Sequence, residues 1–439
     1  MNHQQDTSIP VGLGHRDCLE YRQRTWQRPL SRRAMLTGAL GVAAAVSASS
    51  HVLLHPDVLA HAGALRPGAG PEANILVVIN QSGGNDGLST VIPYTSARYY
   101  KQRPTLAVKA SDALPLTRTA ALHPHLAGMK RLYDAGQLAV VQGVGYPHPD
   151  LSHFQSIITW QTGTVGGRPD SGWLGRYLDT ALGQDRNPLK AIGIGSGLPL
   201  AFASRTNATP AIQSLPDFQI YTDAADSTRT RMLHAFREMN AAADPNPTYA
   251  AIRSAQITTL RGFDTLQAVP TGYKGKVAYP TTDLGKQLQL VAQLIHANLG
   301  TRVFWVDQDG YDDHAAEAVA HDKLLGELDA AVSAFQGDLV AHGWDRRVLL
   351  MTCSEFGRRV EENGDHGTDH GTAAPLLIVG GAVKGGVYGD DPSLTKLDAD
   401  GNLVHQVDFR SVYRTVIERW LGADSVPVLG RGYELLPFV

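Results

Sequence analysis

A dense group of metal-ligating side chains lies in the segment 348–381. Two apolar runs, 348–351 and 376–379, are typical of buried strands. The loop between them holds Glu355, Asp365, His366, Asp369 and His370. Any one of these residues alone is more often a solvated charge. Because ligands of α/β proteins bind at the carboxyl ends of strands, five together predict a site.

Two further apolar runs end in groups that can bind metal ions. The run 75–79 leads into a glycine-rich turn with Asn85 and Asp86, and the run 303–306 leads into Asp312, Asp313 and His314. Glycines let the backbone approach a ligand closely, and carboxylates and imidazoles bind divalent cations. On the turn alone, Asp86 fits a capped tight turn equally well.

Ser152 stands where a fourth apolar run, 138–141, is followed by a helical pattern. The pattern begins after Ser152 and His153, so Ser152 is expected at or near a helix N-terminus. A hydroxyl there either caps the helix or acts as a nucleophile in the positive end of the helix dipole. The sequence leaves both interpretations open.

The elements that must position these residues alternate between strands and helices. Helical spacing recurs over 121–137, 228–240, 282–299 and 324–339, between the apolar runs. This order predicts an α/β fold with a mostly parallel sheet and helices on both of its faces. One edge of that sheet would then gather Asp86, Ser152, Asp312, His314, Glu355 and His370. Asn85, His153, Asp313 and Asp369 would lie close behind them.

The ligand types at this edge indicate a divalent cation. Carboxylates and imidazoles suit zinc, manganese, magnesium or calcium, and no set of thiolates exists for a structural zinc. Cys353, at a strand end, is expected to be a small buried apolar side chain.

The composition describes an ordinary globular chain. Of the 439 residues, 43% are hydrophobic and 18% charged, so a large core can form. The net charge of −3 provides no basic surface for nucleic acid. After the N-terminal region no run of about 18 apolar residues occurs, so no membrane span is expected in the mature chain.

The first 62 residues are typical of a twin-arginine signal peptide. Arg32 and Arg33 precede a weakly apolar run, 36–48, and a possible cleavage site of the A-x-A type follows at 60–62. An uncleaved anchor or a chance arginine pair is the alternative. We expect a partner in the twin-arginine translocase, export to the periplasm or beyond, a linker at 63–74, and one domain at 75–439. The part around 163–280 is expected to be less regular.

Several motifs together resemble the domain-of-unknown-function family 1501. They are LVV…GGNDGLSTVIPY, LHPHLAGMKRLYDAGQLAVVQGVGYP…SHF, DGYDDH, SEFGRR and GTDHGTAAPLLIVGG, spread over about residues 74–435. The family consists of exported bacterial proteins related to the alkaline phosphatase and sulfatase superfamily. The resemblance therefore implies an alkaline phosphatase-like three-layer α/β/α sandwich.

The resemblance also implies roles for single residues. In the superfamily the first strand ends in a metal-binding aspartate, which Asp86 matches, and the nucleophile begins a helix, as Ser152 is expected to do. Asp312 and His314 are similar to a later aspartate and histidine that hold one metal ion. Their spacing is tighter here than is usual in the superfamily.

The second metal position departs from the superfamily pattern. Glu355 stands where an aspartate is usual, Phe356 stands where a histidine is usual, and His370 matches a final histidine. Phe356 cannot bind a metal, so the site can be reduced to one ion, altered, or without catalysis. The resemblance implies a metal-dependent hydrolase of phosphate or sulfate esters, on a small-molecule or polymer substrate. The alternative is a non-catalytic exported protein that binds metal or a partner.

Overall fold

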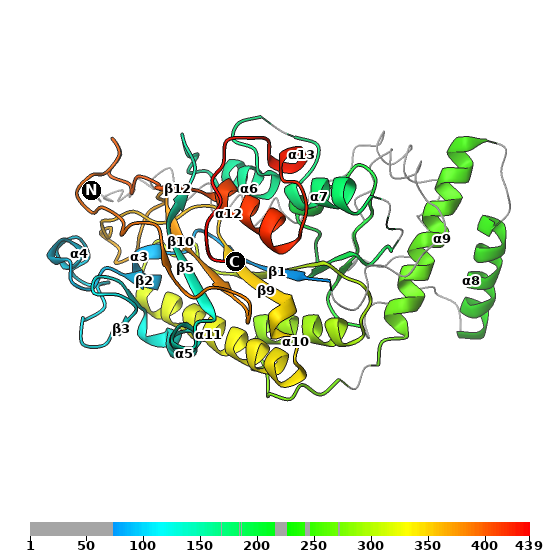
Figure 1. The fold of residues 1–439 in the computed structure, drawn as a ribbon, viewed down its shortest axis with the longest axis horizontal. Coiled ribbons are helices and arrows are strands. Elements are labelled where there is room, and N and C mark those ends of the chain that lie inside the picture. Colours follow the sequence, from blue (N-terminus) through cyan, green and yellow to red (C-terminus); the bar gives the residue numbers. More distant parts are fainter. Residues whose placement is uncertain are drawn as a thin grey trace, which may run out of the picture.

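A central sheet organises the chain. The computed structural model describes residues 73–439 apart from 168, 184, 186, 216–225, 242–245 and 271–272. The expected signal peptide and most of the expected linker lie outside the described residues. The sheet has nine strands in the order β11-β5-β10-β9-β1-β8-β6-β7, and β12 pairs with β5 (Figure 1). Its strands are β1 (Ile75–Ser82), β5 (Leu138–Gly145), β6 (Ala191–Ile194), β7 (Ala211–Ile212), β8 (Val303–Asp309), β9 (Val348–Cys353), β10 (Ala374–Val379), β11 (Gly386–Tyr388) and β12 (Val407–Asp408).

The direction of the strands decides which loops meet. β1 pairs in parallel with β8 and β9, and β8 with β6. β10 alone runs antiparallel to its neighbours, β5 and β9. The residues before β10 therefore reach the same edge as the residues after β1, β5, β8 and β9. The prediction of a mostly parallel sheet is confirmed.

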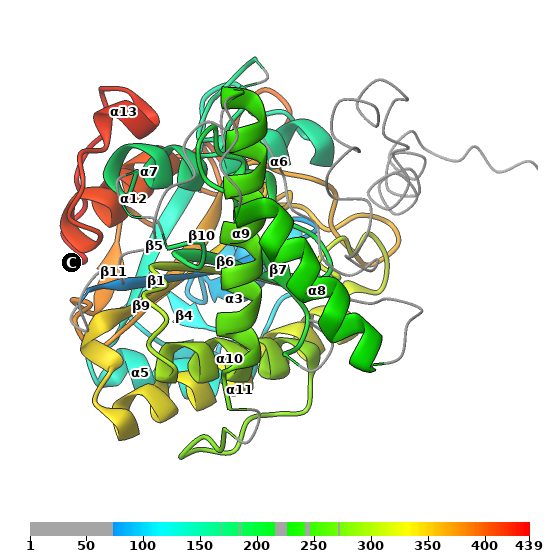
Figure 2. The same cartoon turned by 90° about the vertical axis from the view of Figure 1, so that its right-hand side faces the viewer.

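Helices cover both faces of the sheet, as predicted (Figures 1 and 2). One face packs against α5 (Ala127–Asp134), α10 (Asp283–His296) and α11 (Glu317–His342). The other packs against α6 (His153–Thr162), α7 (Trp173–Ala181) and α12 (Phe409–Thr415), with α13 (Val426–Leu429) beside them. The result is a three-layer α/β/α sandwich.

The alternation of side chains along β1 explains the two cores. Val77 and Ile79 belong to the core under α10 and α11, whereas Leu76 and Val78 belong to the core under α7 and α12. All four are fully buried. A strand covered on both faces must be apolar at every position, which is why its sequence is a continuous β-branched and aliphatic run.

A small second sheet lies beside the main one. Its order is β2-β4-β3, formed by β2 (Val91–Ile92), β4 (Ala121–Leu122) and β3 (Leu114–Pro115). The short helix α3 (Gly87–Thr90) connects β1 to β2, and α4 (Ala97–Gln102) follows β2 and precedes β3. The helix expected over 121–137 is therefore wrong at its start. Pro124 opens a 3-10 turn, Pro124–Leu126, and α5 follows only at Ala127.

The segment 163–280 is more regular than the sequence indicated. It supplies α7 to one face and extends the sheet with β6 and β7. It also forms α8 (Asp226–Ala241) and α9 (Pro247–Gln267), which lie side by side away from the centre of the sheet (Figure 1). α8 and α10 confirm two helices expected from apolar spacing. Within the described residues, no helix is both long and apolar enough to span a membrane.

Candidate metal centre

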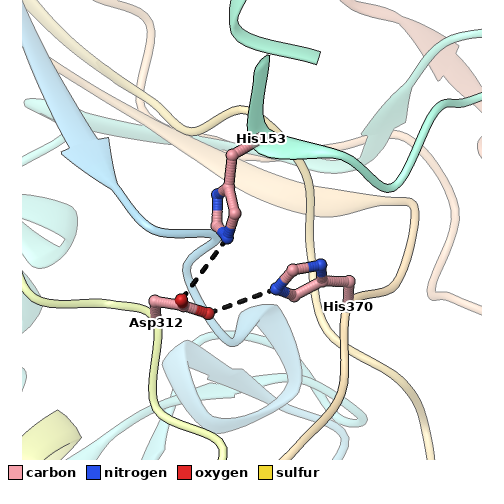
Figure 3. A group of neighbouring side chains, drawn as sticks. All are labelled: His153, Asp312 and His370. Carbon is pink, nitrogen blue, oxygen red and sulfur yellow. Dashed lines mark hydrogen bonds and ion pairs between the residues drawn. The ribbon is translucent and has the colours of Figure 1, made fainter. Parts of the chain in front are cut away.

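Three side chains converge at the carboxyl edge of the sheet: His153, Asp312 and His370 (Figure 3). His153 Nε2 lies 3.4 Å from Asp312 Oδ2, and His370 Nε2 lies 3.2 Å from Asp312 Oδ1. The three donor atoms all lie within 4.8 Å of one another. It is the one group of three such side chains found in the described part of the chain.

The fold brings these residues together from distant parts of the sequence. His153 is the first residue of α6, Asp312 follows β8, and His370 precedes β10. Because β10 runs against its neighbours, its N-terminal loop lies at the edge where β8 ends. Figure 3 shows both imidazoles directed at the carboxylate of Asp312.

The Nδ1 atoms of His153 and His370, on the side of each ring away from Asp312, both lie within hydrogen-bond distance of an oxygen. Nδ1 of His153 lies 2.8 Å from Oε1 of Glu355, and Nδ1 of His370 lies 2.8 Å from the carbonyl of Leu151. An oxygen without a proton can only accept, so both Nδ1 atoms carry the hydrogen. Each Nε2 then turns its lone pair toward Asp312. Metal-binding histidines are usually oriented in this way.

His314 adds a third imidazole to the centre. Its Nε2 lies 2.9 Å from Asp312 Oδ1 and 3.1 Å from Nε2 of His370. Its Nδ1 lies 3.4 Å from the carboxylate of Asp369. Two Nε2 lone pairs at this distance repel each other unless a proton or a metal ion lies between them. Either a proton on one of these nitrogens or a bound cation would satisfy this donor set.

Two of the separations in the centre match those around a single divalent ion. Two ligands that each lie about 2.1 Å from a tetrahedral ion are roughly 3.4 Å apart. The two separations to Asp312 oxygens, 3.4 and 3.2 Å, match that spacing. Three imidazoles with one carboxylate are ligands that zinc or manganese accepts readily.

The surroundings keep Asp312 ionised. Burial alone would raise the pKa of Asp312, but its close contacts with the imidazoles of His153, His314 and His370 and the charge of Arg358 outweigh burial and lower the pKa far below its ordinary value. The carboxylate is thus available to a cation throughout the physiological pH range. Its side chain is 24% exposed and that of His314 is 27% exposed, so one side of the centre is open to solvent.

Phe356 forms the apolar wall of the centre. Its buried ring lies 4.8 Å from the ring of His153 and 4.5 Å from that of His370, measured between centroids. Gly84 lets this ring approach, since a Cβ there would lie 2.4 Å from it, and the backbone of Gly84 has a positive φ of 84°. Phe356 is thus no ligand, but it fixes the planes of two imidazoles.

Ser152 stands at the N-cap of α6, as expected. Its hydroxyl makes no capping hydrogen bond, and its backbone N–H donates to the carboxylate of Asp150 at 2.8 Å. Its two neighbours both belong to the centre, because the carbonyl of Leu151 accepts from His370 and the side chain of His153 faces Asp312. The residue is partly exposed and directly precedes His153 at the start of α6.

Two of the expected ligands have other partners. Asp86 is buried in a bidentate ion pair with Arg103. Glu355 holds His153 and accepts from the N–H of Gly83 at 2.9 Å, so it lies directly behind the centre. Asp86 thus lies apart from the group that gathers His314 with the three residues of Figure 3.

The four residues expected behind the ligands have different positions. His153 lies in the centre itself, and Asp369 supports His314. Asn85 faces away, its amide oxygen 3.0 Å from Nε2 of His321. The backbone N–H of Asp313 donates to the carbonyl of Tyr311.

Sequence reasoning missed two buried arginines, Arg103 and Arg358. Arg358 lies inside the motif SEFGRR, and its guanidinium is 2.8 Å from Asp312. Buried arginines leave no periodic signal in a sequence, because no spacing rule separates them from solvated ones. For Arg358 the sequence offered one sign of a special role: the residue belongs to a motif that follows the end of a strand. Cys353 is buried, as predicted.

One protein family matches most of the sequence. The profile of a family described as "Protein of unknown function (DUF1501)" matches residues 73–417. No curated protein matches the sequence significantly.

The solved structures that match are remote. A protein in the alkaline phosphatase superfamily from Vibrio parahaemolyticus is 10% identical, with 82% of this chain and 69% of that chain covered and a TM-score of 0.34. The PsFucS1 sulfatase from Pseudoalteromonas sp. is 12% identical, with coverages of 80% and 68% and a TM-score of 0.34. A phosphonate monoester hydrolase from Silicibacter pomeroyi is 11% identical, with coverages of 84% and 78% and a TM-score of 0.34.

Proposed function

This chain belongs to the DUF1501 family, and we propose that it is a metal-dependent hydrolase of phosphate or sulfate esters. One observation carries the proposal. Three imidazoles turn Nε2 toward Asp312 at a solvent-open edge, and Ser152 stands beside them at the N-terminus of α6. This set combines a cation site with a hydroxyl that can attack, which ester hydrolysis needs.

The ligands in this proposal are His153, Asp312, His314 and His370. A bound divalent ion would supply a Lewis acid that polarises the ester and favours ionisation of a nearby hydroxyl. Zinc or manganese suits the three imidazoles best, whereas magnesium and calcium prefer oxygen ligands. Glu355 and Asp369 hold two of the imidazoles in the tautomer that binds a cation.

Ser152 is the proposed nucleophile. Its hydroxyl is not used as a helix cap, so it is available for attack. The first amides of α6 point toward the same region, and the positive end of the helix dipole favours negative charge there. A phosphoryl or sulfuryl group bound at this edge would therefore meet the positive end of the helix as well as the bound ion.

A non-catalytic metal-binding or partner-binding protein is the second candidate. Two observations favour it: Phe356 replaces a ligand, and Asp86 is already paired with Arg103. A hydrolase and a binding protein on this fold differ in turnover, and both would bind a metal ion.

The test is hydrolysis of 4-nitrophenyl phosphate and 4-nitrophenyl sulfate by protein reloaded with zinc or manganese. We expect turnover of at least one ester, loss of turnover after chelation, and recovery on adding the metal back. Asp312→Asn should abolish turnover, with Asp424→Asn, a change on the exposed surface, as its control. A protein that binds metal and hydrolyses neither ester supports the second candidate.

We also propose that residues 1–62 direct export through the twin-arginine translocase, to the periplasm or the outside of the cell. The arginine pair, the weak apolar run and the small residues at 60–62 support this. The pathway carries folded proteins, which would allow the centre to load its metal before export.

A further inference from the structure

A buried guanidinium sits behind the metal centre with an oxygen shell of its own. The Arg358 side chain is 1% exposed. Its three nitrogens donate to four backbone carbonyls and one carboxylate, and Nη1 also lies 3.5 Å from Nε2 of His314. The acceptors are Gly84 at 2.7 Å, Thr368 at 2.9 Å, Tyr311 at 2.9 Å, Asp312 at 2.8 Å, and Gly83.

These acceptors belong to three separate loops. Gly83 and Gly84 follow β1, Tyr311 and Asp312 follow β8, and Thr368 precedes β10. The last two loops also carry the ligands Asp312, His314 and His370. One side chain therefore cross-links the loops that form the centre. Cross-linking of several loops by one cation with an oxygen shell is otherwise a task of metal ions.

Arg103 makes a similar arrangement next to it. Its guanidinium forms two bonds to Asp86 and donates to the carbonyls of Arg359 at 2.7 Å and Val360 at 3.0 Å. Both Asp86 and Arg103 are almost completely buried. The carboxylate that the resemblance assigned to a metal ion is thus neutralised by a guanidinium.

Outside the centre, the positions that the resemblance assigned to metal ligands do not fit an ion. Asp86 is paired with Arg103, Phe356 has no donor atom, and Glu355 is bound to His153 and to the N–H of Gly83. A further divalent cation here would face two guanidinium charges in a buried region. Arginine stays charged at all accessible pH values, so this repulsion is permanent.

We infer that the centre binds one divalent ion per chain and that Arg358, by holding three loops together, replaces a second ion structurally. Arg358 is a positioning residue: its N–H groups are used by the loops, and it acts on substrate only through the ligands it holds. The inference rests on the proposed metal site and is independent of whether an ester is hydrolysed.

The first test is the number of ions. Purified protein is saturated with zinc or manganese, freed of excess by gel filtration, and its metal content is compared with its protein concentration. We expect one ion per chain. Two tightly bound ions per chain would overturn the inference even if ester hydrolysis is found. One ion without hydrolysis would leave it standing and remove the proposed hydrolase.

The second test is replacement of Arg358 with chemical rescue. Arg358→Ala should weaken zinc binding about tenfold or more, as changes behind metal ligands do. Millimolar ethylguanidinium should restore most of the zinc affinity. Ethylammonium has the same charge but lacks the planar guanidinium group with its several N–H donors, so it should not restore the affinity. Arg410→Ala is the matched control. Arg410 lies on α12 and pairs with Asp408, so the zinc affinity of this variant should respond to neither additive.

Arg358→Lys tests the same point if the alanine variant does not fold. Lysine keeps the charge but cannot reach three loops with one planar group. We expect weaker zinc binding, measured by competition with a chelator, at an unchanged ratio of one ion. Wild-type zinc affinity in Arg358→Lys, or an alanine variant that loses stability but no zinc affinity, would reduce Arg358 to a packing role and refute the inference.

Discussion

Nδ1 of His153 lies 2.8 Å from Oε1 of Glu355, and both side chains are only 2% exposed. The pair joins two residues that are 202 positions apart in the sequence. Glu355 was expected to be a ligand itself, but its carboxylate holds a histidine that faces the centre. A carboxylate in this position fixes the tautomer of the imidazole and increases its basicity.

We predict that Glu355→Gln lowers zinc affinity by about 10- to 100-fold, the usual cost of losing a supporting carboxylate. The amide has nearly the same shape, so the fold should persist. It removes the negative charge and turns a donor toward either the N–H of Gly83 or the hydroxyl of Ser354. Titration with zinc, followed by calorimetry, measures the effect. Glu418→Gln, in an ion pair with Arg414 near the end of α12, should bind zinc normally. Equal affinity in both variants would exclude a supporting role for Glu355.

The sequence predicted the strands of this fold better than the partners within the site. Runs such as 75–79 and 348–351 must be apolar on both faces, so burial leaves a direct sign in them. The pairing of Asp86 with Arg103 leaves no such sign. It depends on where α4 places Arg103 against the loop after β1, and that packing is decided by tertiary contacts. Tertiary packing also decides whether Glu355 is a ligand or supports His153, so the sequence alone could not distinguish these two roles.

Phe356→Ala should destabilise the protein and the centre together. The ring is buried between two imidazoles, and loss of a buried phenylalanine costs about 3–5 kcal/mol of unfolding free energy. We expect zinc affinity to fall as well, because His153 and His370 lose the surface that fixes their planes. Phe356→Leu refills much of the space and should recover most of the stability. Urea unfolding with and without zinc measures both effects. A variant that unfolds earlier but binds zinc as tightly as the wild type would limit Phe356 to the core.

Glu317 should make stability depend on pH. Burial, followed by the neighbouring charge of Asp86, raises the pKa of Glu317 to about 8 in the folded protein, against 4.5 ordinarily. Between these values the folded state holds a proton that the unfolded state has released. The stabilisation from Glu317 is therefore complete below about pH 4.5 and is lost as the pH rises toward 8.

We accordingly predict that Glu317→Gln is more stable than the wild type at pH 8.5 and no more stable at pH 4.5. The amide keeps an acceptor for the hydroxyl of Thr368, which lies 2.6 Å from the carboxylate, and needs no proton. Within the window, the difference should grow by up to about 1.4 kcal/mol per pH unit. Urea unfolding of both proteins across this range tests the sign. A gain that is the same at every pH would show that the carboxyl of Glu317 does not titrate in this window.

Export should depend on the arginine pair. Arg32→Lys combined with Arg33→Lys keeps the charge but removes the pair that the translocase reads, so the precursor should stay in the cytoplasm. Cell fractionation followed by immunoblotting measures the distribution. Arg22→Lys with Arg24→Lys, ten and eight residues upstream of Arg32, is the matched control and should export normally. Normal periplasmic levels of the Arg32/Arg33 variant would refute the signal assignment.

Ser152→Ala separates the nucleophile from the helix cap. A serine that caps a helix through its hydroxyl contributes about 1 kcal/mol, but the hydroxyl of Ser152 makes no such bond. The change should therefore alter the unfolding free energy by less than about 0.5 kcal/mol, as at ordinary surface positions. Ester turnover should fall by roughly 10⁴-fold or more, because the attacking group is gone. Zinc content should be unchanged, since no proposed ligand is altered.

Two further helix starts provide the controls for this prediction. Ser96 is also an N-cap serine without a capping bond, at the start of α4, so Ser96→Ala should leave both stability and turnover intact. Thr282 caps α10 through its hydroxyl, 3.2 Å from the N–H of Gly285, so Thr282→Ala should lose about 1 kcal/mol and keep turnover. If Ser152→Ala instead behaves like Thr282→Ala, the hydroxyl serves the helix and the attack must come from another group, such as water. If it behaves like Ser96→Ala, Ser152 has no part in the chemistry.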